Sequence, residues 1–120
     1  MILVAIAGTI PSKKNTQRIS KHGGIYKQQD VRDYEDLVAW SMIKSKGALL
    51  VPFGIRGTFT IAKRKDLDNA LTTVLDSLQL CGVIRNDKDL MHISDLKKVP
   101  ANKRQGERCD LELYPLTPAA

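Results

Sequence analysis

The chain has 120 residues, of which 42% are hydrophobic and 27% charged, a composition typical of an ordinary folded protein with one core. This length is too short for two domains, so we expect residues 1–120 to form a single domain. Nineteen Lys and Arg against thirteen Asp and Glu give a formal charge of +6. Such an excess favours a polyanionic partner, most often nucleic acid, because neutralising phosphates releases condensed counterions.

The sequence gives no sign of a membrane protein, a secreted protein, or a protein whose cysteines bind zinc or form disulfides. No stretch approaches the roughly 20 apolar residues of a membrane span, and the apolar run 1–8 is too short for a secretory signal. We therefore expect a cytoplasmic protein without membrane contact. Cys81 and Cys109 lie far apart without zinc-finger spacing, so both are expected to be reduced. His22 and His92 are isolated and belong to no triad or zinc pattern.

The first half of the chain predicts one strand and one helix with a long connection. Residues 2–7 are uniformly apolar, as in a strand buried on both faces. Residues 9–24 form a cationic segment expected to be flexible, and residues 24–29 form a possible short strand. A helix is expected from Asp30, as its N-cap, until Gly47 ends it. Its apolar stripe consists of Val31, Tyr34, Leu37, Val38 and Met42.

The second half predicts a strand, a helix and two further strands. Residues 54–62 alternate apolar and polar positions, the period of a half-buried strand. Leucines and valine at helical spacing predict a helix over 67–78, stopped by Gly82. Residues 89–99 and 108–116 predict strands joined by the cationic loop 100–108. The expected architecture is α+β, with two helices packed on a mixed β-sheet.

The stretch KRKDLDN, residues 63–69, places Asp66 and Asp68 where the strand should pass into the helix. At a strand end, their spacing of two would point both carboxylates to one side, whereas Asp68 as a helix cap would face the free N–H groups of the first turn. Two carboxylates held close repel each other unless a cation lies between them, and Mg²⁺ prefers such oxygen ligands. The alternative reading is a helix cap and its neighbour without further function.

Asp87 and Asp89 lie in a turn before the next predicted strand. They can meet the first acid pair only if the intervening chain folds back along the helix. Metal ligands inside a basic surface suit a nuclease, because the metal orients the scissile phosphate and activates water while cations hold the strand. The fifth positions of the two acid runs, Ala70 and Met91, exclude a calcium-binding EF-hand loop. The cations flanking the acids are Lys63, Arg64, Lys65, Lys88, Lys97 and Lys98.

The run RKDLDNALTTVLDSL, followed by GVIRNDKDL and LKK, resembles the RusA family of Holliday-junction resolvases. The segment IPSKKN after the first predicted strand and the total length are also similar to that family, so the resemblance covers nearly the whole chain. It implies a Mg²⁺-dependent homodimeric endodeoxyribonuclease, with Mn²⁺ as a possible substitute. Such enzymes bind four-way DNA junctions and cut two opposing strands symmetrically in recombination and repair. It also implies a bacterial or phage origin.

The resemblance assigns metal binding and catalysis to Asp66, Asp68 and Asp87. Asp87 is preferred to Asp89 because the family's key acid is the second member of a pair, here Asn86-Asp87. The residues expected to contact DNA are Lys13, Lys14, Asn15, Lys63, Arg64, Lys65, Asn69, Lys97, Lys98, Lys103 and Arg104.

Thr72 is a departure from the family pattern, which usually has a lysine one helical turn after the second acid. A hydroxyl cannot replace an ammonium, so Lys65 and Lys97 are the candidate substitutes. The alternative function is a non-catalytic protein of the same fold that binds branched DNA. Three clustered carboxylates favour the enzyme, because they would repel the phosphates that a pure binder must hold.

Overall fold

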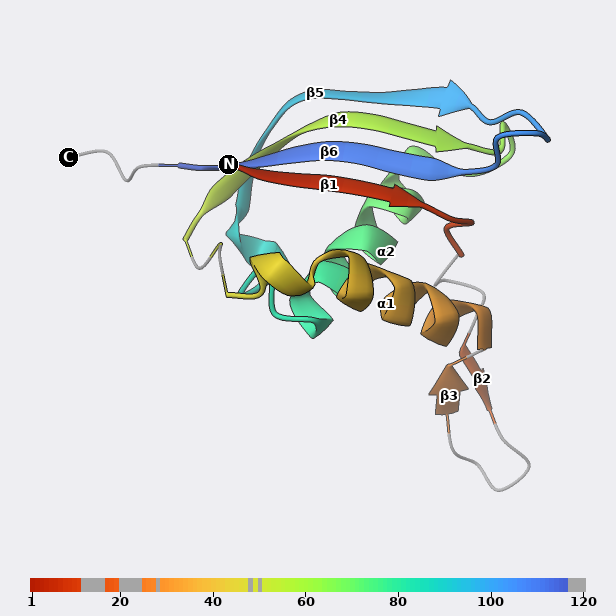
Figure 1. Ribbon diagram of the computed structural model, residues 1–120, viewed down its shortest axis with the longest axis horizontal. Helices are drawn as coiled ribbons and strands as arrows, with labels where there is room; N and C mark the ends of the chain where they lie inside the picture. Colours follow the sequence, from red (N-terminus) through yellow and green to blue (C-terminus); the bar gives the residue numbers. More distant parts are fainter. Residues whose placement is uncertain (12–16, 20–24, 28, 48, 50, 117–120) are drawn as a thin grey trace.

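Two α-helices cover one face of a four-stranded mixed sheet in the computed structural model, which describes residues 1–11, 17–19, 25–27, 29–47, 49 and 51–116 (Figure 1). The strands of the sheet are β1 (Ile2–Ala7), β4 (Phe53–Ile61), β5 (Leu90–Pro100) and β6 (Arg108–Pro115). Their spatial order is β1-β6-β4-β5, with β6 antiparallel to both neighbours and β4 parallel to β5. The predicted α+β architecture is confirmed.

A small hairpin of β2 (Gln17–Ile19) and β3 (Ile25–Lys27) lies outside this sheet. The short strand expected within 24–29 is present as β3, while β2 falls in the segment that was expected to be flexible. Residues 12–16 and 20–24 of that segment lie outside the described residues.

β1 was expected to be buried on both faces, and this prediction is wrong. Its side chains alternate, with Val4 and Ile6 buried and Leu3 and Ala5 exposed. The reason is that α1 and α2 lie on one side of the sheet, so the other side of this edge strand meets solvent (Figure 1). Sequence alone could not show this, because apolar side chains also occur on exposed surfaces, so an unbroken apolar run does not establish burial of both faces.

α1 (Gln29–Ser41) is followed by the short 3₁₀ turn η2 (Ile43–Ser45) and by Gly47, which has a positive φ of 77°. Asp30 lies in the first turn rather than at the N-cap, and its Oδ1 accepts the N–H of Val31 at 2.9 Å. The predicted apolar stripe is buried except for Leu37, which is 36% exposed at the border of the stripe.

α2 (Leu67–Leu80) connects the parallel strands β4 and β5, and Gly82 follows it with a φ of 84°. The register pairs Phe53 with Leu90 at one end of the strands and Ile61 with Pro100 at the other. The chain therefore leaves β4 at one end of the sheet and enters β5, through the 3₁₀ turn η3 (Asp87–Asp89), at the opposite end (Figure 1).

The core lies between the helices and the inner face of the sheet, where Phe53, Phe59, Leu78 and Leu113 are fully buried. Cys109 lies among them, and burial raises the pKa of its thiol to about 11. Both cysteines are free thiols, as expected. Among the helices of the described part of the chain, none has the length and apolarity needed to cross a lipid bilayer.

Candidate active site

The turn between β4 and α2 carries the first acid pair. Asp66 is the N-cap of α2, with φ −86° and ψ 138°, yet its side chain makes no capping hydrogen bond. Asp68 is the second residue of the helix, and its Oδ1 accepts the N–H of Asn69 at 2.9 Å. Neither acid ends a strand, and the cap is Asp66 rather than Asp68. An N-cap carboxylate that leaves its own helix uncapped is available to a ligand.

Asp66 faces a cavity of about 210 Å³ at this turn. Mg²⁺ in proteins typically uses one or two carboxylates together with waters and substrate phosphates. Asp66 would supply one such carboxylate from the cavity lining, and the exposed Asp68, which is not part of that lining, would supply a second from the next helical position but one. The free N–H groups at the start of α2 also favour a bound phosphate. The residues that line the cavity are Ile10, Pro11, Arg64, Lys65, Asp66, Asn69 and Ala70.

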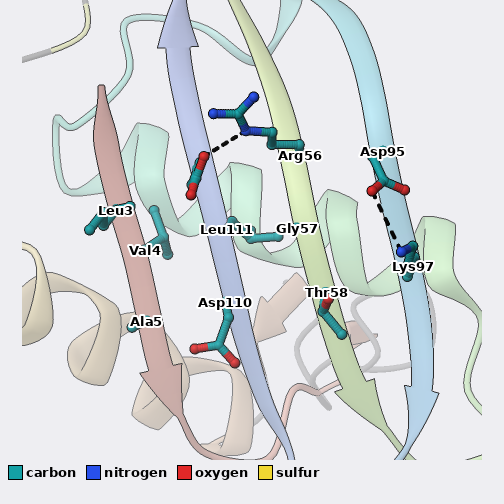
Figure 2. A pocket seen from close by; sticks show the side chains of 11 residues that line it. Leu3, Val4, Ala5, Arg56, Gly57, Thr58, Asp95, Lys97, Asp110 and Leu111 are labelled. Carbon is teal, nitrogen blue, oxygen red and sulfur yellow. Dashed lines mark hydrogen bonds and ion pairs between the residues drawn. The ribbon is translucent and has the colours of Figure 1, made fainter.

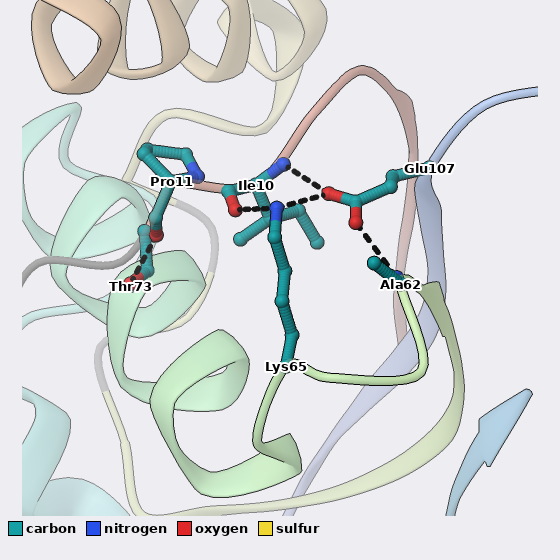
Figure 3. Close-up of polar contacts among 6 residues, drawn as sticks. All are labelled: Ile10, Pro11, Ala62, Lys65, Thr73 and Glu107. Carbon is teal, nitrogen blue, oxygen red and sulfur yellow. Dashed lines mark hydrogen bonds and ion pairs between the residues drawn. The ribbon is translucent and has the colours of Figure 1, made fainter. Parts of the chain in front are cut away.

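Lys65, expected at the DNA, is engaged within the protein. Its Nζ donates to Oε1 of Glu107 at 2.7 Å and to the carbonyl of Ile10 at 2.8 Å (Figure 3). Only 17% of the Lys65 side chain is exposed. An ammonium held in this way cannot also reach toward a DNA strand, so Lys65 does not replace the lysine that the family has at the position of Thr72.

Glu107 is the residue that sequence reasoning missed. The sequence pattern places it in the cationic loop 100–108, where it is the single acid between Asp95 and Asp110. Its charge, opposite to that of the surrounding segment, is the one local signal, and it does not indicate the distant partner Lys65. In the structure, 9% of its side chain is exposed, and its Oε1 and Oε2 accept the backbone N–H groups of Ile10 and Ala62 at 2.9 and 2.7 Å.

The stability of the fold should depend on pH through Glu107. Burial alone would raise the pKa of its carboxyl, but hydrogen bonds from Lys65, Ala62 and Ile10 and the Lys65 charge outweigh burial, so that the pKa lies below its ordinary value of 4.5. A lowered folded-state pKa contributes stability that is complete above pH 4.5 and is lost as the pH falls through the folded pKa. Glu107→Gln is therefore expected to cost about 2 kcal/mol of unfolding free energy at pH 7.

Thermal and urea unfolding between pH 7 and pH 3 checks this expectation. The difference between wild type and Glu107→Gln should shrink as the pH falls below 4.5. Asp110→Asn is the matched control, because it neutralises an exposed carboxylate, 46% accessible, paired with Arg108 on β6. It should cost far less. A pH-independent difference for Glu107→Gln would mean that its charge does not matter.

Lys98 and Lys97 point to different sides of β5. Lys98 donates to the carbonyl of Lys63 at 2.8 Å and to the carbonyl of Lys65, so it lies against the turn that carries Asp66. Lys97 instead forms an ion pair with Asp95 at 3.6 Å beside a hollow of about 370 Å³ on the sheet face opposite the helices (Figure 2). Lys98, and not Lys97, therefore accompanies the acid pair.

Several other expected DNA contacts gather at the same end of the sheet. Pairing of Ile61 with Pro100 and of Thr60 with Arg108 brings the turns after β4 and after β5 together. We call this region the basic end, and it comprises the exposed residues Lys63, Arg64, Lys98, Lys103 and Arg104. Lys13, Lys14 and Asn15 lie outside the described residues.

The structure does not bring Asp87 to Asp66 and Asp68 within one chain. The Asp87 N–H donates to Oε1 of Gln79 at 3.0 Å, which places Asp87 beside the last turn of α2. Gln79 follows Asp68 by eleven residues, so it lies roughly 16 Å farther along the helix. Within the described part of the chain, accordingly, no group of three or more Asp, Glu, His or Cys residues is placed to hold a metal ion.

Asp87 and Asp89 differ in how they are used. Arg85 donates two hydrogen bonds, at 3.0 and 2.9 Å, to the carboxylate of Asp89, whose side chain is 15% exposed. Asp87 is exposed, and among the described residues its carboxylate has no hydrogen bond or ion pair. Of the two acids, Asp87 is therefore the one whose carboxylate is available to an external ligand.

Thr72 lies where the helical spacing predicts, one turn after Asp68 on an exposed part of α2. Its hydroxyl donates to the carbonyl of Asp68 at 2.9 Å, a bond within the helix. The side chain therefore brings no charge to the site.

An acid pair at a helix N-terminus within a basic surface suits the class of proteins that act on phosphates with a metal ion. No model of a known protein family matches the chain. The crossover junction endodeoxyribonuclease RusA of Aquifex aeolicus (strain VF5) is 24% identical over 99 residues, which span 78% of this chain and 79% of that protein. The chain is thus similar to this enzyme over most of both lengths, at an identity too low to assign the family.

Proposed function

We propose that this protein is a Mg²⁺-dependent endonuclease that resolves four-way DNA junctions as a homodimer. The observation that carries the proposal is the carboxylate of Asp66, which makes no capping hydrogen bond to α2. It lies next to Asp68 in the sequence and within the basic end of the sheet. The named relative, a crossover junction endodeoxyribonuclease, supports the class of reaction. A divalent metal held by Asp66 and Asp68 would orient the scissile phosphate and supply an activated water.

The chain's own residues have separable tasks in this proposal. Asp66 and Asp68 provide negative oxygen ligands, and the N–H groups of the first turn of α2 favour a phosphate nearby. Arg64 lines the cavity beside Asp66 and can pair with a phosphate next to the cleaved one. The exposed side chains of Lys63, Lys103 and Arg104 hold the strand by charge, which makes binding depend on salt concentration, whereas the Lys98 ammonium is bonded to the turn itself.

A homodimer also provides a place for Asp87. Two cuts in opposing strands need two sites related by a two-fold axis, and an isologous dimer supplies that symmetry. Asp87 lies at the far end of α2 from Asp66 within one chain. If two copies pack with their α2 directions opposed, the Asp87 of each copy approaches the acid pair of the other. We therefore include in the proposal that each metal site takes Asp66 and Asp68 from one protomer and Asp87 from its partner.

A cleavage assay tests the function directly. The purified protein should cut a synthetic four-way junction at paired positions in the presence of Mg²⁺, and should leave a linear duplex of the same sequence intact. Light scattering should give about twice the chain mass of 13.4 kDa. Tight junction binding without cuts in either Mg²⁺ or Mn²⁺ would instead identify a non-catalytic branched-DNA-binding protein.

Thr72→Lys is expected to accelerate the cut. The new ammonium would lie one helical turn from Asp68, where it can stabilise negative charge that develops on the phosphate. Because the Lys65 ammonium is bonded to Glu107 and the Lys98 ammonium to backbone carbonyls of the turn, neither is available to the phosphate, and we expect at least about a tenfold gain in single-turnover rate. All rates are measured at saturating protein. Thr72→Arg serves as a second cationic variant, and Thr72→Val controls for loss of the hydroxyl. Equal rates for all three would place residue 72 away from the scissile phosphate.

A further inference from the structure

Three chain segments that are far apart in sequence converge on the Glu107 carboxylate. Ile10 follows β1, Ala62 and Lys65 belong to the turn after β4, and Glu107 itself precedes β6. Figure 3 shows one carboxylate receiving the Ile10 N–H, the Ala62 N–H and the Lys65 ammonium. The same ammonium also donates to the Ile10 carbonyl at 2.8 Å. The contacts therefore form a closed network rather than a single ion pair.

This network builds the walls of the cavity that Asp66 faces. Ile10, Pro11 and Lys65 line that cavity together with Asp66. Thr73 of α2 donates to the carbonyl of Pro11 at 3.2 Å, which fastens the segment after β1 to the helix (Figure 3). Connecting turns at a strand end are otherwise among the more mobile parts of a fold. Through its bonds to Ala62 and Lys65, the Glu107 carboxylate holds the turn that immediately precedes Asp66.

We propose that Glu107 is a positioning residue for the acid pair. It holds Lys65, and through the backbone of residue 65 it fixes where the carboxylates of Asp66 and Asp68 are presented to a metal ion. This inference rests on the proposed function. A buried ion pair is weak evidence for a role in stability alone, because apolar residues of similar volume often serve equally well. Three donors aimed at one carboxylate instead define a unique arrangement of the turn.

Metal binding by the free protein separates positioning from stability. Mn²⁺ binding, followed by electron paramagnetic resonance without DNA, measures the site independently of cleavage. Loss of a residue that orients metal ligands typically weakens affinity 10- to 100-fold, so Glu107→Gln should weaken Mn²⁺ binding by about tenfold or more. Glu107→Asp keeps the charge but is one methylene shorter, and should give a smaller loss.

A core variant provides the matched control. Val38→Ala removes two methyl groups at a fully buried position of α1 and should lower the melting temperature through the core rather than through a polar contact of the turn. It should leave Mn²⁺ affinity unchanged at temperatures where it is folded. If Glu107→Gln does not fold, Glu107→Asp decides the question. Mn²⁺ affinities equal to wild type in the folded Glu107 variants would overturn the positioning role. Absence of both Mn²⁺ binding and junction cleavage in the wild type would instead overturn the proposed function, and with it this inference.

Discussion

Replacing Asp68 by asparagine is expected to reduce junction cleavage by at least about 100-fold while junction binding is retained or strengthened. The substitution removes a ligand charge from the site, and metal assistance contributes several kcal/mol of barrier lowering, at about 1.4 kcal/mol per factor of ten. It also removes a negative charge that repels the DNA phosphates. The helix should remain intact, because Asp66 and not Asp68 is the N-cap.

Cleavage and binding must be measured on the same folded preparations. Single-turnover cleavage at saturating protein reports the chemical step, and a gel-shift titration in Ca²⁺ or without metal reports binding. Asp36→Asn is the matched control, because it neutralises an exposed acid of α1 that lies beside Leu80 and Cys81, at the end of α2 opposite the turn. Near wild-type cleavage by a folded Asp68→Asn protein would remove Asp68 from the proposed site. Parallel loss of binding and cleavage would assign Asp68 to DNA binding instead.

A heterodimer of Asp68→Asn and Asp87→Asn chains is expected to cut DNA although each homodimer is inactive. If each site combines the acid pair of one protomer with Asp87 of its partner, the mixed dimer retains one intact site and one site that lacks two ligands. Two different affinity tags, purified in tandem after coexpression, isolate this heterodimer. It should nick one strand at about half of the wild-type rate per dimer, without completing the paired cut.

The inverted heterodimer makes the experiment decisive. One chain carries both substitutions and its partner carries none, so that a shared site predicts two damaged sites and no cutting. A site built within one chain predicts the opposite results. The heterodimer of double variant and wild type would then be active, and the heterodimer of Asp68→Asn and Asp87→Asn chains would be inactive. Failure to recover any doubly tagged particle would argue against the homodimer itself.

The element pattern of this protein is largely determined by local sequence. Alternating apolar and polar positions predict β4, and the three- and four-residue spacing of leucines and valine predicts α2. Gly82 follows that helix with the positive φ that glycine adopts most easily. These signals are local, because side chains return to the same face of a helix or strand every few residues. The resulting apolar pattern is visible without knowing which element packs against that face.

The acid pair was likewise visible in the sequence, since Asp66 and Asp68 are neighbours along the chain. The sequence did not show whether these acids end the strand or cap the helix, because a spacing of two residues fits both positions. The structure places Asp66 at the N-cap without using its carboxylate there. Sequence could indicate that two carboxylates lie close together, but which of them stays available depends on the hydrogen bonds that form.

Only the tertiary structure decided which distant residues meet. The parallel pairing of β4 with β5 sends α2 along the full length of the sheet, so Asp87 lies at the end opposite Asp66, although the family resemblance implied one cluster. The same pairing, with its local irregularities, sets which face each lysine of β5 occupies, bringing Lys98 to the turn and Lys97 to the outer face. Glu107 reaches Lys65 across 42 positions of the chain. Such contacts depend on strand order and register, which are set by packing of the whole core, and no local pattern encodes them.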